Sequence, residues 1–225
     1  MNRLPLLLTR PAPGNAALCE ALGPSAARFE VLDCPLMEIV PLKVAQWPRP
    51  EDSVAFTSRN GVAVAPPGEG RRAWCVGEAT AEAASAAGYE AIAAAGDVLS
   101  LLPIIEAPER GKLWHLHGTH RRGDLAQWLS DRGIACESVP VYDQVARPLP
   151  APVKARIATG EAMVAPLFSP RTAGLLAAEV KNLGANLRVL ALSEQVANVW
   201  PGPVEATARK PSLAAMVDIM GYTLG

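Results

Sequence analysis

Residues Val139 to Val145 have the sequence VPVYDQV, and residues Cys34 to Val40 have the related sequence CPLMEIV. Each stretch follows a helical pattern, a glycine and a short apolar run. Proline ends a buried strand or places it at a sheet edge, and the β-prone residues that follow keep the chain extended. We interpret the two stretches as twin crossings between two lobes, with Tyr142 in a ligand-binding cleft between them. The alternative is that both are ordinary edge strands of one sheet.

The composition is that of a folded soluble protein. Half of the 225 residues are apolar and the formal net charge is −1, so no global field favours nucleic acid or an anionic membrane. Any anionic ligand must then be held by local groups. The sequence shows no N-terminal leader and no apolar run of membrane-spanning length, which predicts a cytoplasmic protein. The four cysteines lack metal-like spacing and are expected to be free thiols.

Short apolar runs alternate with helical patterns along almost the whole chain, which is typical of α/β proteins with parallel sheets. Predicted strands begin near residues 53, 73, 89, 113 and 134 between the crossings, and near 4, 29, 163, 188 and 204 outside them. Two doubly wound, flavodoxin- or Rossmann-like lobes fit this pattern, one inserted in the other and joined by a two-stranded linker. The predicted boundaries are 1–34 with 149–225 for the first lobe, 43–139 for the second, and 35–42 and 140–148 for the linker strands.

Two local patterns carry finer predictions. Asn15 is a candidate N-cap for a helix that runs to Leu22. Pro166 interrupts the apolar run from Met163 to Phe168, which predicts an edge strand or a bulge at that position.

Several predicted strands run into a hydroxyl, glycine or arginine residue at the start of a helix. In open parallel sheets ligands bind outside the carboxyl ends of the strands, where helix N-termini offer free N–H groups and a partial positive charge. Such groups suit carboxylates or phosphates. The alternative for any single residue is that it only caps the helix and binds no ligand. The candidate binding residues that share this position are Arg10, Thr57, Ser58, Arg59, Gly77, Thr80, Ser169, Arg171 and Ser193.

No glycine-rich nucleotide loop follows a predicted strand, so a nucleotide cofactor is not expected. His115 and His117 would share one face of a strand, but His120 lies beyond a turn and no second cluster of Cys or His completes a metal set. We therefore expect no metal, and we interpret the histidines, with Arg121 and Arg122, as a solvent-exposed basic rim.

At these strand ends the sequence resembles the uroporphyrinogen-III synthase family, with motifs in family order along nearly the whole chain. The matching segments are Leu6–Pro11, Phe56–Val62, Val76–Thr80, His117–Gly118 with Arg121–Arg122, Val139–Tyr142, Phe168–Thr172, Leu192–Ala197 and Pro211–Leu213. The resemblance implies two α/β lobes joined by a two-stranded ladder, a substrate cleft and no cofactor. It also implies a catalytic role for Tyr142 and substrate contacts from His117, Gly118, Arg121 and Arg122.

The resemblance implies the reaction as well. Hydroxymethylbilane, which carries eight carboxylates, is cyclised to uroporphyrinogen III with inversion of ring D and loss of water. Positioning can supply about 7–11 kcal/mol of such a barrier, and one general acid adds about 10²–10⁴-fold in rate. The expected partners are this substrate and, in transient contact, the preceding enzyme of the tetrapyrrole pathway. We expect a monomer that binds neither nucleic acid nor membrane.

Other classes of protein share parts of this pattern. A two-lobed cytoplasmic small-molecule-binding protein would share the crossings, although the missing export signal counts against it. A response-regulator-like domain would need an acidic cluster at one strand end, and a small oxidoreductase would need a nucleotide loop. Substrate turnover separates the enzyme from the binding protein.

Overall fold

The computed structural model describes residues 3–121 and 123–224. The chain divides into two compact units, which we call unit 1 (Met1–Glu38 with Val145–Gly225) and unit 2 (Ile39–Gln144). Both units are α/β with parallel sheets, which confirms the predicted fold class. In the described part of the chain, no helix has the length and apolar character needed to cross a membrane.

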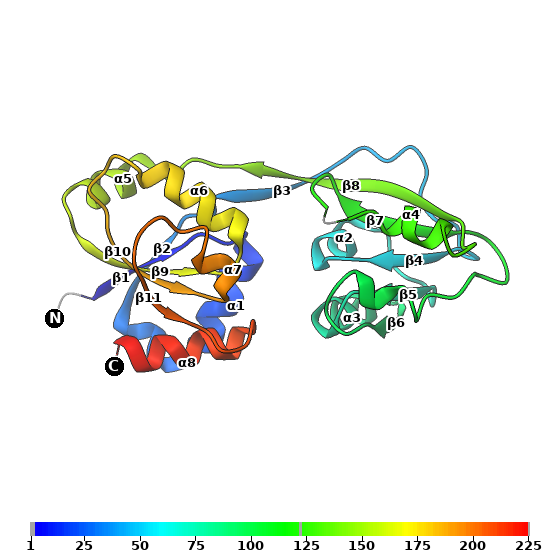
Figure 1. Ribbon diagram of the computed structural model, residues 1–225, viewed down its shortest axis with the longest axis horizontal. Helices are drawn as coiled ribbons and strands as arrows, with labels where there is room; N and C mark the ends of the chain where they lie inside the picture. Colours follow the sequence, from blue (N-terminus) through cyan, green and yellow to red (C-terminus); the bar gives the residue numbers. More distant parts are fainter. Residues whose placement is uncertain (1–2, 122, 225) are drawn as a thin grey trace. The chain divides into compact units, whose positions relative to one another are not determined.

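The sheet of unit 1 is entirely parallel in its described residues. Its strands are β1 (Leu4–Leu8), β2 (Phe29–Asp33), β9 (Ala162–Leu167), β10 (Asn186–Ala191) and β11 (Val204–Thr207). They lie in the order β11-β10-β9-β1-β2 (Figure 1). Numbered within the unit, this is the 2-1-3-4-5 order of flavodoxin-like sheets.

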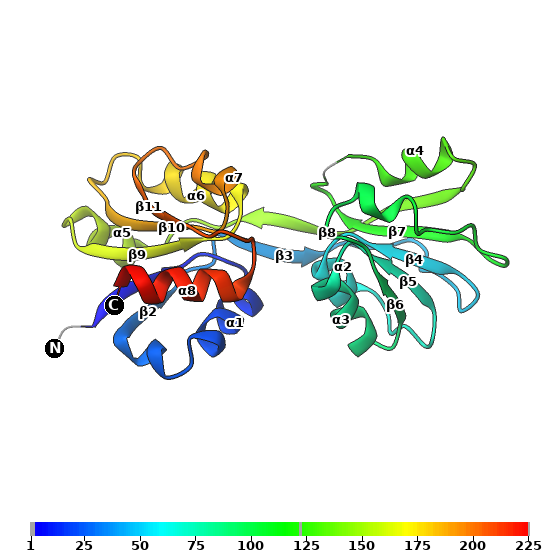
Figure 2. The same cartoon turned by 60° about the horizontal axis from the view of Figure 1, so that its bottom comes forward.

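Helices cover both faces of this sheet because strand side chains alternate between faces. The helical segments are α1 (Ala12–Leu22), η1 (Gly23–Arg28), α5 (Ala151–Ala158), α6 (Pro170–Val180), α7 (Glu194–Ala197) and α8 (Leu213–Leu224). Leu6 and Leu8 pack with residues of α1 and α8. Leu7, between them, packs with residues of α5, α6 and α7 on the other face. Figure 2 shows these helical layers on opposite sides of the sheet.

The prediction of an edge strand or bulge at Pro166 is wrong. Pro166 lies in β9, the central strand of the sheet, and faces Leu190 of β10 in a ladder without a register shift. On the other side, β9 pairs with β1 through Val164 and Leu6. Proline removes one N–H group, and successive N–H groups of a strand point to opposite neighbours. The ladder with β10 therefore continues through the proline.

The prediction that Asn15 caps a helix is also wrong. Helix α1 begins before it, with Pro11 at the N-cap position, because proline has a backbone suited to a helix start. Asn15 is buried, and its side-chain amide donates to Leu8 O at 3.3 Å and to Asp33 Oδ1 at 2.6 Å. Its oxygen accepts from Arg10 N at 3.1 Å. Asn15 thus joins the carboxyl ends of β1 and β2.

The sheet of unit 2 follows a different strand order. Its strands are β3 (Met37–Pro41), β4 (Ser53–Phe56), β5 (Arg72–Cys75), β6 (Glu90–Ala93), β7 (Leu113–Gly118) and β8 (Cys136–Ala146). In the described residues they lie in the order β3-β8-β7-β4-β5-β6, and β4 to β8 pair in parallel. Without β3, the order within the unit is 3-2-1-4-5, that of Rossmann-type sheets.

Helical segments also cover both faces of this second sheet. They are α2 (Arg59–Val64), α3 (Glu78–Ala86), η2 (Leu99–Leu101) and α4 (Leu125–Ser130). Val54 and Phe56 pack with residues of α2 and α3, whereas Ala55 packs with residues of η2 and α4. The register places His115 of β7 opposite Ala55. His115 and His117 therefore share the face that α4 covers.

Strands β3 and β8 carry the chain between the two units. Leu42 N donates to Val141 O at 2.9 Å, and Arg147 N donates to Leu36 O at 2.9 Å. The proposed limits of the linker strands, 35–42 and 140–148, stay a prediction.

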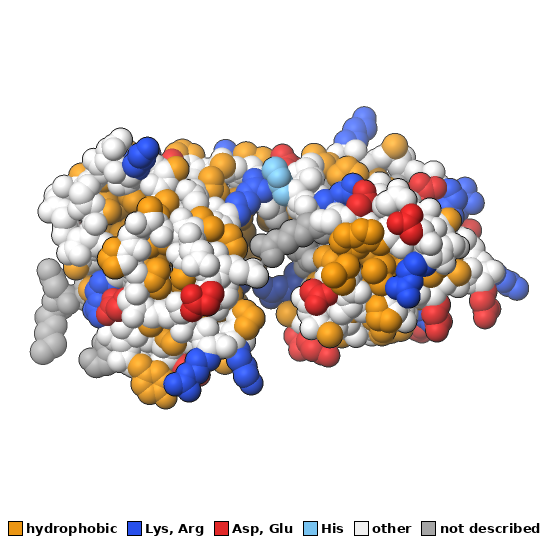
Figure 3. All heavy atoms as spheres, in the orientation of Figure 1, with side chains coloured by type: hydrophobic (Ala, Val, Ile, Leu, Met, Phe, Trp, Pro, Cys, Tyr) orange, Lys and Arg blue, Asp and Glu red, His pale blue; other side chains and the backbone are white. Residues whose placement is uncertain are grey.

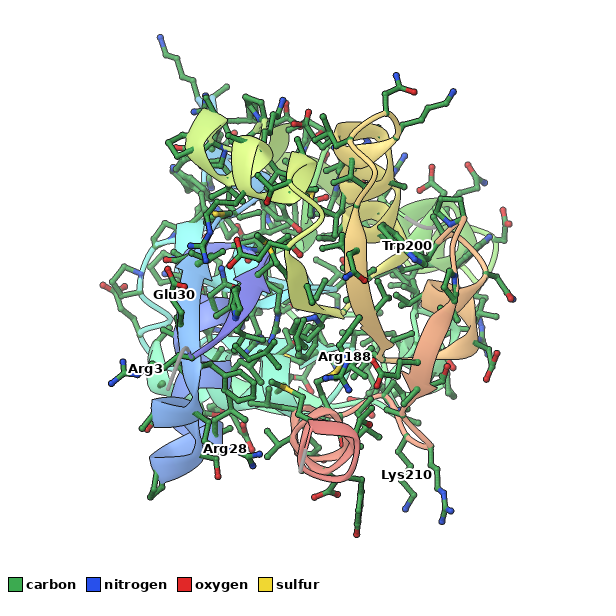
Figure 4. All side chains as sticks on the ribbon, turned by 90° about the vertical axis from the view of Figure 1, so that its left-hand side faces the viewer. Arg3, Arg28, Glu30, Arg188, Trp200 and Lys210 are labelled. Carbon is green, nitrogen blue, oxygen red and sulfur yellow. The ribbon has the colours of Figure 1, made fainter. Side chains whose placement is uncertain are left out.

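Arginine side chains join elements near the amino ends of the strands of unit 1 through ion pairs and a hydrogen bond to the backbone. Arg156 of α5 bonds Glu30 of β2, with 2.6 Å between Nη1 and Oε1, and Glu161, with 2.8 Å between Nε and Oε2. Arg188 of β10 donates to Thr223 O of α8 at 2.9 Å. Figure 4 shows Glu30 on β2 and Arg188 beside α8. The hydrogen bonds from Arg156 lower the pKa of both Glu30 and Glu161.

Candidate active site

The carboxyl end of the sheet in unit 1 brings several candidate residues to one edge. The strands are parallel, so the residues that follow β1, β9 and β10 meet there. The chain order reverses between β1 and β9, and open α/β sheets bind their ligands at such switch points. The predicted binding residues at this edge are Arg10, Ser169, Arg171 and Ser193.

Arg10 extends across this switch point. Its guanidinium carbon lies 4.0 Å from the ring centroid of Phe168, the residue that follows β9. Its Nη1 donates to Gly14 O at 3.1 Å, and a Cβ atom added at Gly14 would lie 2.8 Å from Arg10 Nε. The cation–π contact and the close backbone hold the arginine over the ends of β1 and β9.

The hydroxyl residues of this edge differ in what they do. Ser169 caps α6, since its Oγ accepts from Thr172 N at 3.1 Å, and the two hydroxyl oxygens lie 2.9 Å apart. Ser193 stands at the N-cap of α7, but its side chain makes no capping bond. Arg171 lies half-buried in the first turn of α6. Ser169 therefore matches the alternative of a cap, whereas Ser193 has no capping role.

The switch point of unit 2 lies between β4 and β7. Thr57 and Ser58 follow β4, and Ser58 caps α2 by accepting from Asn60 N at 3.2 Å. Gly77 is the N-cap residue of α3, and Thr80 is buried in the first turn of that helix. These residues lie at the carboxyl edge of the sheet, as predicted from the strand pattern, but Thr80 has little exposed surface.

Tyr142 lies at this same edge, on the face that α2 and α3 cover. The register places it opposite Gly118, the last residue of β7. A Cβ atom added at Gly118 would lie 2.6 Å from Tyr142 Cε2 and 2.7 Å from Cζ, so the ring rests directly on the glycine backbone. Tyr142 is only 3% exposed. Within the described residues its hydroxyl has no hydrogen-bond partner, whereas the hydroxyl of Tyr89 donates to Pro66 O at 2.7 Å.

The expected solvent-exposed basic rim is wrong for His115 and His117. Both rings are buried because β7 is an inner strand that α4 covers. His117 Nε2 lies 2.9 Å from Ser138 Oγ and Nδ1 lies 2.7 Å from Gly118 O. Burial lowers the pKa of His115 to about 3 and also lowers the pKa of His117. Both imidazoles are therefore neutral at physiological pH, and His117 uses both ring nitrogens within the protein.

Arg121 is exposed, and its guanidinium group forms an ion pair and a hydrogen bond with residues of unit 2. Its Nη2 lies 2.9 Å from Asp124 Oδ2, and its Nη1 donates to Ser138 Oγ at 2.9 Å. Asp124 also accepts from Gln127 N at 3.3 Å and so caps α4. The structure thus connects Arg121 to α4 and β8. The other predicted arginine of this segment, Arg122, lies outside the described residues.

Arg59 faces a different part of unit 2 from the histidines. It lies on an open hollow of about 660 Å³ between α2 and α3, whose other lining side chains are apolar and include Val62, Ala83 and Ala87. On the face drawn in Figure 3, Lys and Arg side chains are interspersed with Asp and Glu in each unit.

The metal-ligand chemistry of the described residues is limited. They contain no group of three His, Cys, Asp or Glu side chains placed to hold a metal ion. All four cysteines are free, as predicted, and Cys34 and Cys75 are buried.

Sequence reasoning missed the contact between His115 and Thr57, whose Nε2 and Oγ1 atoms are 3.2 Å apart. Both residues lie on the same face of the sheet on neighbouring segments, but their proximity can be inferred only once the register of β4 and β7 is known. It also missed Asn15, because a buried amide that joins two strand ends has the same sequence pattern as a helix cap.

The fold and these strand-end edges define a protein of two doubly wound α/β units. The family model described as uroporphyrinogen-III synthase HemD matches residues 16–218. The chain therefore belongs to the uroporphyrinogen-III synthase family, which confirms the resemblance seen in the sequence.

Solved structures support the fold. Uroporphyrinogen-III synthetase from Helicobacter pylori 26695 is 17% identical, with a TM-score of 0.64 and 100% of each chain covered. A mutant uroporphyrinogen III synthase from the extremely thermophilic bacterium Thermus thermophilus is 18% identical, with a TM-score of 0.54 and 98% of each chain covered. Among curated protein sequences, no relative matches the chain.

Family membership establishes the reaction. The protein is a lyase of tetrapyrrole biosynthesis that cyclises hydroxymethylbilane to uroporphyrinogen III, with inversion of ring D and loss of water.

Proposed function

We propose that the carboxyl edges of both sheets bind carboxylates of hydroxymethylbilane, and that Tyr142 donates a hydrogen bond to the hydroxyl that leaves the substrate. The observation that carries this proposal is the Tyr142 hydroxyl, which has no hydrogen-bond partner among the described residues and rests on Gly118 at a strand-end edge. A phenol supplies one O–H donor. The surrounding core fixes the ring, so the donor is held in place before the substrate arrives.

The chemistry requires a proton donor at one step. The hydroxymethyl carbon loses its oxygen as water once a proton is supplied, which leaves an electrophilic azafulvene. The substituted carbon of the last ring then attacks, and the spiro intermediate reopens and closes with that ring inverted. Unaided closure gives the other isomer, so the protein must hold the chain as well as assist departure. Positioning accounts for the larger share of the barrier.

The arginines and hydroxyls at the helix starts suit the carboxylates of the substrate, because both offer donors beside the positive end of a helix. Arg10, Arg59 and Arg171 are the proposed charged contacts. The proposal extends to a cytoplasmic monomer that receives its substrate in transient contact with the preceding enzyme. Such contact shortens the time in which free hydroxymethylbilane can close to the other isomer.

Replacing Tyr142 with phenylalanine tests the proposal, because Tyr142→Phe keeps the ring and removes the donor. We expect kcat for the inverted isomer to fall by about 10- to 10⁴-fold, with an unchanged Tm. Products must be resolved by isomer, since the unaided reaction would otherwise mask the loss.

Tyr89→Phe is the matched control, because it removes a hydroxyl of a buried tyrosine in the same unit that donates to Pro66 O within the protein. It should lower Tm and leave kcat unchanged. A Tyr142→Phe variant that forms the inverted isomer at the parental rate would remove Tyr142 from the mechanism.

A further inference from the structure

The contact between His115 and Thr57 lies beneath the switch point of unit 2. His115 Nε2 is 3.2 Å from Thr57 Oγ1, while Nδ1 is buried and has no hydrogen-bond partner among the described residues. Thr57 is half-buried and follows β4 directly. The buried imidazole therefore has one hydrogen-bonding contact among the described residues, and its partner, Thr57, lies at the carboxyl edge of the sheet.

The enclosure determines where the imidazole carries its proton. A neutral imidazole has one N–H donor and one bare nitrogen acceptor. A proton on Nδ1 of His115 would leave a buried N–H group without an acceptor, and such orphaned donors are rarer in proteins than unused acceptors. A proton on Nε2 instead gives a hydrogen bond to Thr57 Oγ1 and leaves only a bare lone pair at Nδ1.

This tautomer determines what the threonine can do. When Thr57 Oγ1 accepts from His115, the O–H of Thr57 must donate elsewhere, and within the described residues the hydroxyl has no other partner. Threonine has few accessible χ1 rotamers, so the imidazole also selects the direction of the hydroxyl.

We propose that His115 is a positioning residue: it donates to Thr57 and thereby turns the Thr57 hydroxyl into a hydrogen-bond donor toward the substrate. This inference rests on the proposed function, in which Thr57 contacts the substrate. His115 itself is buried on the face that α4 covers, so in this proposal it acts only through Thr57.

His117 provides an internal comparison on the same face. Its ring centroid lies 4.7 Å from that of His115. Its Nδ1 faces Gly118 O, a pure acceptor, so Nδ1 must carry the proton, and Nε2 accepts from Ser138. The two neighbouring rings thus carry their protons on different nitrogens, although burial keeps both neutral.

Long-range proton–nitrogen NMR spectra of the imidazole rings test the first part of the proposal. The chain has three histidines, and the third, His120, is exposed. We expect a pyrrole-type Nε2 and a pyridine-type Nδ1 for His115, with the reverse for His117. Spectra of His115→Gln and His117→Gln assign the rings. A proton on His115 Nδ1 would overturn the proposal.

A double-mutant cycle tests the second part. Thr57→Val keeps the shape and removes the hydroxyl, and His115→Phe keeps an aromatic ring and removes the donor. Each should lower kcat/KM by about 10- to 100-fold, the range for a hydrogen bond to a charged group. The double variant should be no worse than Thr57→Val, because the two groups act as one unit.

His115→Gln provides the rescue, since its amide can place an N–H near the Nε2 position. It should recover most of the kcat/KM lost in His115→Phe, and it remains informative if the phenylalanine variant does not fold. If the losses in kcat/KM of Thr57→Val and His115→Phe are additive, His115 only packs in the core. The same conclusion follows if His115→Gln is as slow as His115→Phe. If Thr57→Val keeps the parental kcat/KM while the tautomers are as expected, the Thr57 contact of the proposed function fails and this inference fails with it. Loss in Thr57→Val with full activity in His115→Phe refutes the inference alone.

Discussion

Gly118 is the position where one added methyl group should disturb both stability and turnover. In Gly118→Ala, the new Cβ would lie 2.6 Å from Tyr142 Cε2 and 3.0 Å from Tyr142 Oη, whereas ordinary contacts are at least 3.4 Å. The ring cannot move freely, because it is 3% exposed and packed among core residues on the α2–α3 face. Either the ring or the end of β7 must shift.

The expected loss of stability follows from this overlap. Inserting a methyl group into a packed core costs about 1–3 kcal/mol. If unit 2 unfolds as a domain of roughly 100 residues, each kcal/mol lowers Tm by about 4–8 °C. Calorimetry or circular dichroism should therefore show a fall of about 4–24 °C. The displaced phenol should also lower kcat for the inverted isomer more than it raises KM, because the donor acts at the departure step.

Gly174→Ala is the matched control, because among the described residues outside its own helix backbone the atom nearest to the added Cβ is Val199 Cγ1, at an ordinary contact distance of 3.6 Å. The position lies inside α6, where alanine is about 1 kcal/mol more favourable than glycine, so Tm should stay or rise. A Gly118→Ala variant with the parental Tm and kcat would refute the placement of the Tyr142 ring on the glycine.

Three further predictions concern a buried carboxylate, an ion-pair network and the proposed charged contacts. Asp52→Ala should destabilise unit 2 by about 1–3 kcal/mol in urea unfolding, because Trp114 Nε1 donates to Asp52 Oδ2 at 3.0 Å in the core. Arg156→Ala should lower Tm most above pH 5: the pKa values of Glu30 and Glu161 are held below their ordinary value of 4.5 by its hydrogen bonds. That stabilisation is present above 4.5 and is lost as pH falls through the folded-state pKa values. Replacing Arg10, Arg59 or Arg171 singly with alanine should raise KM more than it lowers kcat in steady-state assays, because each replacement removes binding that the ground state and the transition state share.

Each of these predictions has its own control. Asp97→Ala removes an exposed carboxylate that accepts from Ser100 N at 2.8 Å, and it should change the free energy of unfolding far less than Asp52→Ala does. A Tm difference between the parent and Arg156→Ala that persists unchanged to pH 3 would show that the ion pairs do not stabilise the folded state. Normal KM values in all three arginine variants would mean that the substrate carboxylates bind elsewhere.

The alternation of strands and helices was predictable from sequence because buried parallel strands are continuous apolar runs. Leu4 to Leu8 and Leu113 to Leu116 contain the same signal, and both are strands. Pro166 was misjudged because a proline blocks only one of the two ladders of a strand, and sequence cannot show which ladder the strand needs.

The candidate site was predictable only at the level of strand ends. Thr57 and Ser169 follow buried strands, so their place at a carboxyl edge could be expected. The burial of His115 and His117 could not, because histidine side chains are found both in protein interiors and at protein surfaces. Their burial depends on α4 packing over the sheet, which is a tertiary contact that no local pattern contains.

The division of the chain has a consequence for protein synthesis. Unit 1 is built from two segments, and β1 needs β9 as its neighbour, yet more than a hundred residues separate β2 from β9. At a ribosomal rate of about 5–20 residues per second, β1 waits on the order of 10 s for that partner. Unit 2 is continuous and emerges complete in this interval. Nascent chains ending after Gln144 should therefore contain a folded second unit and an N-terminal segment, Leu4 to Leu8, that is open to chaperones and proteases.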